Sequence, residues 1–199
     1  MKLFGSGFDG QITRLARMLG ILLVVAAAGC HQPRPLVGEK RDAEEVAVYR
    51  AVVSGLVAGG APQVVDGTAT VPRHLPGRES LQPEVDGPEF DDFIARVSVE
   101  SPLQSTASLP ANWVVVPSAA IHDWFDGGPR AGLARLYELY PESTGIVTLS
   151  RVGFSTNGLR ALVYVGVWRG PLAGSGALYM MRKAHGRWEV QSTHASWIS

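Results

Sequence analysis

A histidine followed directly by an aspartate, His122-Asp123, is the pair of residues in this sequence that most directly suggests acid–base chemistry. An imidazole oriented by a carboxylate can transfer protons near neutral pH. Neighbouring side chains on a regular helix diverge by about 100 degrees, however, so this pair cannot form a dyad there. We keep a hydrolase that uses His122 or His194 as an alternative function, with its catalytic residues unassigned.

The other reactive residues do not have the spacing of a metal or cofactor site. The five histidines lack the close pairs of a metal site: His31, His74, His122, His185 and His194. Glu89, Asp91 and Asp92 are typical of a solvated helix start, where negative charge suits the helix dipole. Residues 170–176 are rich in glycine but precede a strand, which predicts a wide hairpin turn and not a phosphate loop. We therefore expect no metal and no cofactor.

The single cysteine, Cys30, follows a short apolar run that ends in small residues and is preceded by basic ones. The uncharged stretch of residues 18–28 is much shorter than the about twenty residues that span a bilayer as a helix, so it predicts a cleaved export signal over residues 1–29. Residues 27–30, Ala-Ala-Gly-Cys, resemble the lipobox of bacterial lipoproteins. An ordinary buried thiol after an N-terminal core helix is the alternative.

This resemblance implies cleavage between Gly29 and Cys30, a lipid on the Cys30 thiol, and thus a membrane anchor. Because His31 is not an aspartate, the resemblance also implies the outer membrane, with the protein facing the periplasm. The proline-marked residues 30–40 are predicted to be a tether. With Cys30 bound to lipid, the domain has no thiol for a disulfide, a thiolate metal site or a nucleophile.

The remaining chain, residues 41–199, is predicted to be one domain. Without residues 1–29 the chain keeps fifteen of its 18 Lys and Arg and seventeen of its 18 Asp and Glu, because that segment holds Lys2, Arg14, Arg17 and Asp9. A nearly neutral chain lacks the basic surface that nucleic-acid binding requires, so we expect no nucleic-acid partner.

The first two thirds of this domain are predicted to mix helices with short strands. The first expected element is a helix from an N-cap at Asp42 to a stop at Gly59-Gly60, which is followed by a strand over residues 63–71 and a polar loop over 72–88. A second helix should come next, with four apolar residues on one face: Phe90, Phe93, Ile94 and Val97. After it we expect a strand over residues 113–117, a helix capped by Ser118, and a helix that Pro141 ends.

The last third changes to the alternating pattern of strands. Residues 146–154, 159–168, 177–183 and 188–198 are predicted to form an antiparallel meander, with turns at Asn157-Gly158, at 170–176 and at His185-Gly186. The fold class is therefore α+β, with the helices packed on a C-terminal meander of about four strands.

One strand of this meander carries the residues most suited to recognition. Arg160, Tyr164 and Trp168 share one face of the strand, and the opposite face is more apolar: Ala161, Val163, Val165 and Val167. Tyrosine and tryptophan anchor interfaces and ligand clefts, which makes Arg160, Tyr164 and Trp168 a candidate binding surface. Packing of these side chains under the helices is the favoured alternative.

Several short stretches together resemble a family of uncharacterised bacterial exported proteins. The similarity spans nearly the whole mature domain and is densest from Tyr140 onward. It is carried by residues 45–49, Asp92-Phe93, 140–145, 150–154, 161–165, the turn at 170–176, Lys183, Gly186, Trp188 and Trp197-Ile198-Ser199. The family implies no activity, substrate or catalytic residue.

These observations predict a membrane-anchored, periplasm-facing lipoprotein whose domain is a binding or interaction module without enzymatic activity. Its partners would be the membrane, through the lipid on Cys30, and an envelope protein or a small molecule. A cystatin-like or NTF2-like inhibitor or ligand-binding domain is a further alternative, which rests on fold analogy alone.

Overall fold

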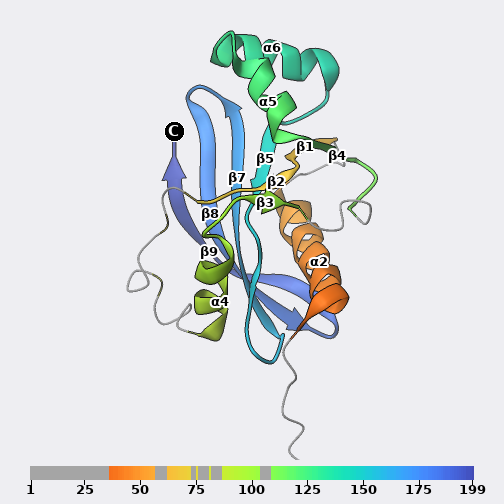
Figure 1. Cartoon of the computed structure of the whole chain (residues 1–199), viewed down its shortest axis with the longest axis vertical. Helices are drawn as coiled ribbons and strands as arrows, with labels where there is room; N and C mark the ends of the chain where they lie inside the picture. The colour runs from red at the N-terminus through yellow and green to blue at the C-terminus, as the bar shows by residue number, and fades with distance from the viewer. Residues whose placement is uncertain (1–35, 57–61, 73–74, 76–80, 82–86, 104–108) are drawn as a thin grey trace, which may run out of the picture. The chain divides into compact units, whose positions relative to one another are not determined.

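A computed structural model describes residues 36–56, 62–72, 75, 81, 87–103 and 109–199 of the chain (Figure 1). The predicted export signal, Cys30, the tether up to residue 35, His74 and the helix stop at Gly59-Gly60 lie outside these ranges. Within them, no helix has both the length and the apolar character that a membrane crossing requires.

Helix α2 (Gly38–Leu56) opens the described domain. It begins four residues before the expected N-cap, so Asp42 lies inside the helix and the prediction of a cap there is wrong. Leu36, just before the helix, is buried in the core cluster that α2 itself helps to form. The packed domain therefore includes residues that were assigned to the tether.

A seven-stranded sheet forms the centre of the domain and confirms the α+β class with a C-terminal meander. Its strand order is β4-β1-β5-β7-β8-β9, and β6 pairs with β7 beside this path. The strands are β1 (Gln63–Asp66), β4 (Trp113–Val116), β5 (Ile146–Leu149), β6 (Gly153–Phe154), β7 (Arg160–Gly170), β8 (Ala173–Ala184) and β9 (Arg187–Ile198). Strand β1 runs parallel to both β4 and β5, whereas β5, β7, β8 and β9 are antiparallel neighbours.

Two predicted strands are each divided in two. The strand expected over residues 63–71 consists of β1 and the two-residue β2 (Thr68–Ala69), which pairs with β3 (Ser101–Pro102) in a separate ribbon. The strand expected over residues 146–154 is broken after Leu149: Ser150 still bonds Tyr164 of β7, whereas the backbone N–H of Val152 donates to Glu45 of α2 before β6 begins.

The glycine-rich turn is also narrower than expected. Gly170 pairs with Ala173, so only Pro171 and Leu172 connect β7 to β8, and Gly174 and Gly176 are strand residues. The hairpin at His185-Gly186 is confirmed, with both residues at positive φ (50° and 78°).

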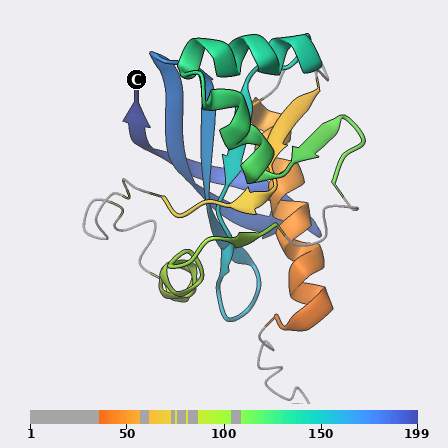
Figure 2. The ribbon, with the colours of Figure 1, turned by 45° about the horizontal axis from the view of Figure 1, so that its top comes forward.

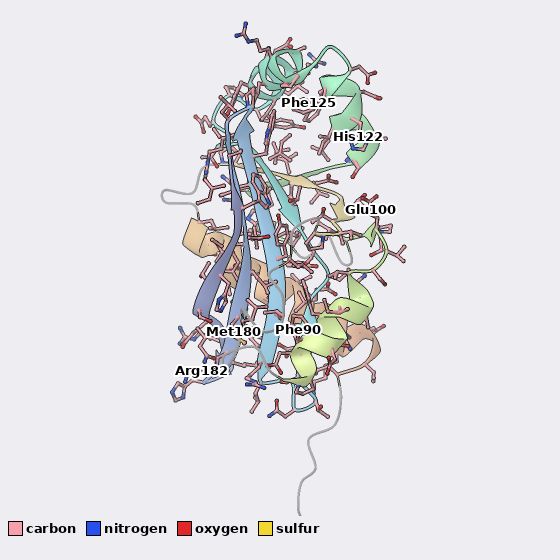
Figure 3. The ribbon with its side chains drawn as sticks, turned by 90° about the vertical axis from the view of Figure 1, so that its left-hand side faces the viewer. Phe90, Glu100, His122, Phe125, Met180 and Arg182 are labelled. Atoms are coloured by element: carbon pink, nitrogen blue, oxygen red, sulfur yellow. The ribbon has the colours of Figure 1, made fainter. Side chains whose placement is uncertain are left out.

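Three helices besides α2 are described: α4 (Pro88–Arg96), α5 (Ser118–Phe125) and α6 (Pro129–Leu139). Helix α2 lies on one side of the sheet, and α4 and α5 lie on the other (Figures 2 and 3). Ser118 is the first residue of α5 and makes no capping bond; its hydroxyl instead bonds Asp66 at the end of β1. The predicted cap at Ser118 is therefore wrong.

The two sides of the sheet carry separate cores. Under α2, the side chains of β7 and its neighbours form the largest cluster, which contains Ala161, Val163, Val165 and Val167 as expected. On the opposite side, Phe93 and Val97 of α4 pack on Leu162, Leu178 and Met180, and the α5–α6 pair forms a third cluster at one end of the sheet.

Candidate functional site

A buried carboxylate, Glu45 of α2, is surrounded by hydrogen-bond donors of the protein itself. It accepts hydrogen bonds from Arg151 at both oxygens, with Nε to Oε1 and Nη2 to Oε2 each 2.8 Å. Its Oε1 also accepts from the Tyr49 hydroxyl at 2.6 Å and from the backbone N–H of Val152 at 3.0 Å. Only 1% of the Glu45 side chain is exposed, so the charge needs these donors to be stable in the interior.

The break between β5 and β6 supplies two of these donors. Ser150 stays joined to β7 through bonds in both directions with Tyr164, because its N–H donates to the Tyr164 carbonyl and its hydroxyl accepts from the Tyr164 N–H. The Tyr49 hydroxyl also lies 2.9 Å from the Ser150 carbonyl. These bonds turn Arg151 toward α2, so the irregular backbone is what places the guanidinium on Glu45.

Helix α4 adds a second acid–base pair beside the first. Asp92 pairs with Arg41 of α2 and accepts the backbone N–H of Phe154 at 2.7 Å. Arg96 of α4 reaches Glu45 Oε2 at 3.4 Å. We call the set formed by Arg41, Glu45, Tyr49, Asp92, Arg96 and Arg151 the Glu45 cluster; it joins α2, α4 and the β5–β6 segment.

Burial shifts the titration of two members of the Glu45 cluster. It raises the pKa of Tyr49 well above its usual value of 10.0, and the negative charge of Glu45 acts in the same direction. Burial also lowers the pKa of Arg96 below its usual value; Glu45 opposes this shift, whereas the positive charge of Arg41 adds to it. Tyr49 is therefore held as a neutral hydrogen-bond donor.

Chemically, the Glu45 cluster is suited to holding elements together. Each oxygen of Glu45 is occupied by donors of the protein itself, and the Glu45 side chain is closed to solvent. A general base must instead reach the proton of a substrate. Sequence reasoning missed the cluster, because its members come from segments that lie far apart in the sequence, as Glu45 and Arg151 do.

The acidic start of α4 is not solvated as predicted. Glu89 is fully buried and lies 2.8 Å and 3.0 Å, through its two oxygens, from Nη2 of Arg160 on β7. Asp92 belongs to the Glu45 cluster. Two of the three acids thus hold α4 on the sheet, because Arg160 and Arg41 reach them from neighbouring elements. Within the described part of the chain, no group of histidine and acidic residues could hold a metal ion.

The candidate surface of Arg160, Tyr164 and Trp168 does not form one open patch. Tyr164 is buried beneath α4 and accepts a hydrogen bond from Nε1 of Trp197 at 2.6 Å. Trp168 meets Phe125 of α5 edge to face, with ring centroids 4.9 Å apart. Burial raises the pKa of Tyr164, while the bond from Trp197 lowers it. Tyr164 and Trp168 thus pack under helices, whereas 42% of the Arg160 side chain is exposed.

The two histidines of the hydrolase alternative lie on different elements. His122 is exposed on α5 and points away from the sheet (Figure 3). His194 lies on β9, where its Nε2 is 3.3 Å from the Ser192 hydroxyl. The sequence correctly predicted a helix at His122 and a strand at His194. The two residues therefore lie on separate elements.

Strand β9 lies at one end of the sheet order, and no described strand pairs with its outer edge. This 12-residue strand ends the sheet order and pairs with β8 alone among the described strands. Residues 190–199 contain no Asp, Glu, Lys, Arg or Pro, and the same is true of residues 173–181 on β8. Val190 and Ile198 are 44% and 80% exposed. Edge strands are usually protected by charges, proline or bulges, and over residues 190–199 this edge has register shifts but neither charge nor proline.

Comparison with known proteins adds no further assignment: the chain matches no protein-family model, and no match is found among curated proteins or solved structures.

Proposed function

We propose that this chain is a bacterial lipoprotein whose domain, tethered through lipid on Cys30 and facing the periplasm from the outer membrane, serves as a non-enzymatic interaction module. The observation that carries the interaction role is the edge of β9 over residues 190–198, which is free of charged residues and which no described strand other than β8 pairs with. The charged groups of the Glu45 cluster are engaged with one another, which leaves the β9 edge as the surface best suited to a partner.

The anchor is supported by the sequence around Cys30 and by the position of Leu36. Only five residues separate Cys30 from Leu36, the first described residue, which is packed in the core. An extended chain advances at most about 3.5 Å per residue, so a lipid on Cys30 would hold the domain within about 20 Å of the membrane surface. This short reach suits a module that acts at the membrane.

The anchor is tested by the mass and the location of the mature protein. We expect the native chain to begin at Cys30, to carry the mass of acyl groups, and to partition with the outer membrane. A Cys30→Ser variant should retain its signal or appear in the soluble fraction. A native chain without acyl groups, or a Cys30→Ser chain that has lost its signal and still stays with the membrane, would contradict the anchor.

The interaction role needs a test of its own. We propose to attach a photo-activated cross-linker at Thr193 on β9 and, as the matched control, at exposed Ala134 on α6, in cells that express the full chain. The β9 probe should give one discrete adduct that the α6 probe does not give. Equal, diffuse labelling from both positions would contradict an interaction through β9.

A further inference from the structure

The end of the domain at which the chain enters it is built around one contact. Leu36 is buried and packs on the turn between β6 and β7, where a Cβ at Gly158 would lie 3.1 Å from the Leu36 Cδ1. The carbonyl of Leu159, the next residue of this turn, accepts the backbone N–H of Lys183 near the end of β8 at 2.8 Å. The start of α2, the β6–β7 turn and the β8–β9 turn thus lie at one end of the domain, which we call the Leu36 end (Figure 1).

Two aliphatic side chains are exposed at the Leu36 end. Val37 follows Leu36 and is 72% exposed, and Leu159 follows Gly158 and is 50% exposed. Because Leu36 lies against Gly158, the two exposed residues come from neighbouring points of the backbone. Single apolar residues on a surface need no explanation, but these two flank the place where the chain enters and form one apolar surface there.

The charges around this apolar surface are of both signs. Glu39 and Lys40 of α2 are exposed, and so is Arg187 after the β8–β9 turn. Arg182 of β8, which Figure 3 labels at this end, lies 3.9 Å from Glu189 of β9 through its Nη2. Long basic side chains can cover apolar surface and still keep their charge in water. Since these charges nearly balance, a partner of this surface is held by the aliphatic side chains and not by charge.

From these features we propose that the Leu36 end lies on the membrane surface, with Val37 and Leu159 against the lipid. This inference rests on the proposed anchor, because only five residues separate Cys30 from Leu36. That tether spans at most about 20 Å. The 11-residue strand β7 is about 36 Å long, so its far end, at the β7–β8 turn, lies beyond the reach of the tether.

A lipid surface is the partner that fits this place, because the anchor would hold the Leu36 end beside one. Aliphatic side chains gain from burial at the boundary between headgroups and acyl chains. Two such side chains bind weakly by themselves, and a covalent anchor raises the local concentration of lipid around them. The contact would therefore orient the domain, while the anchor retains it. Strand β9 would then run away from the membrane into the periplasm (Figure 1).

Photo-cross-linking to lipid tests this orientation. A photo-activated amino acid replaces Leu159 or, as the matched control, Leu172, which is 86% exposed in the turn at the other end of β7. The native protein is purified from its membrane and placed in vesicles of phosphatidylcholine. The Leu159 probe should give about tenfold more lipid adduct in the mass spectrum than the Leu172 probe, because the yield follows the local concentration of lipid. Equal yields from the two probes would overturn the inference.

Substitution of the second aliphatic residue tests whether the contact is apolar. Val37→Asp should lower the lipid adduct of the Leu159 probe severalfold, because a carboxylate resists removal from water. The fold should tolerate this change, since aspartate suits the position before a helix. Val99→Asp is the control: Val99 is 70% exposed, and its neighbour Glu100 lies away from the Leu36 end in Figure 3. An adduct that Val37→Asp leaves unchanged, or that forms only when phosphatidylglycerol is added to the vesicles, would show that the aliphatic side chains do not make the contact.

The acyl mass of the same protein separates this inference from the proposed anchor. If acyl groups are present and the two probes give equal yields, the anchor is right and the contact is wrong. If the native chain lacks acyl groups, the free Cys30 thiol can be coupled to a maleimide-bearing phospholipid in the vesicles. A Leu159 adduct that then exceeds the Leu172 adduct would show that the contact is right and the anchor is wrong.

Discussion

Glu45 and Arg151 form a forked ion pair across 106 positions of the sequence, with both contacts at 2.8 Å. The guanidinium is 11% exposed and the carboxylate 1%. A forked arginine–carboxylate contact fixes direction as well as distance, because two parallel N–H groups meet two oxygens. The pair therefore sets where the irregular segment after β5 lies against α2.

Removal of the Glu45 charge should destabilise the domain strongly. Glu45→Gln would keep the shape of the side chain and leave Arg151 without its counter-charge, a change that costs about 3 kcal/mol or more for a buried pair. Urea denaturation followed by circular dichroism measures this loss. Arg135→Ala, which breaks the exposed pair with Glu138, should cost less than about 0.5 kcal/mol. Equal effects of the two variants would contradict the role given to Glu45.

Alkaline pH should weaken the fold through its buried tyrosines. Burial raises the pKa of Tyr49, Tyr164 and Tyr179 above 10.0, so above that pH the folded chain holds protons that the unfolded chain has released. The free energy of unfolding must then fall as the pH rises from about 10 toward the folded-state pKa values. Denaturation midpoints measured between pH 8 and 11 test this trend.

Tyr49→Phe is the matched variant for that measurement. This variant removes the tyrosine whose pKa is raised well above 10.0. The loss of stability at alkaline pH should therefore become shallower, while the part that comes from Tyr164 and Tyr179 persists. An unchanged slope would show that Tyr49 does not keep its proton in the folded state.

Gly176 should tolerate no side chain. A Cβ at this position of β8 would collide with Nε1 of Trp197 and with the Tyr164 hydroxyl, which are hydrogen-bonded to each other. Overpacking of this kind costs about 1–3 kcal/mol, so Gly176→Ala should lower the melting temperature. Gly55→Ala is the control, because nothing lies within 4 Å of a Cβ there and alanine favours a helix. It should leave the melting temperature unchanged or raise it.

The periodicity of apolar residues in the sequence predicted most of the helices and strands, but not the contacts between them. The alternation in β7 identified Ala161 and Val163 as core, because a buried strand face must be apolar along its length. The pairing of β1 with β4 and β5 could not be foreseen, since parallel neighbours are far apart in sequence and their short apolar runs carry no sign of register. The start of α2 was missed because Val37, which precedes the helix, is not a capping residue, and Gly38 begins the helix at a positive φ of 54°.

The buried ion pairs were missed for a different physical reason. A charged residue is mostly exposed, so Glu45 and Glu89 are expected at the surface unless the partner is known. Arg151 and Arg160 reach them from distant strands, and no local pattern records this.

Trp168 is expected to act on stability and not on association. Its ring packs against Phe125 at one end of the sheet, away from the open edge, so Trp168→Ala should remove the anchor of the α5–α6 pair and cost about 3 kcal/mol. Denaturation of the variant measures this cost, and Trp168→Phe, which keeps an aromatic ring at the site, should recover most of it. With the photo-activated cross-linker at Thr193, Trp168→Ala should leave the yield of the discrete adduct unchanged as long as the domain is folded. Loss of cross-linking in a folded Trp168→Ala protein would instead mean that Trp168, and not the edge of β9, lies in the interface.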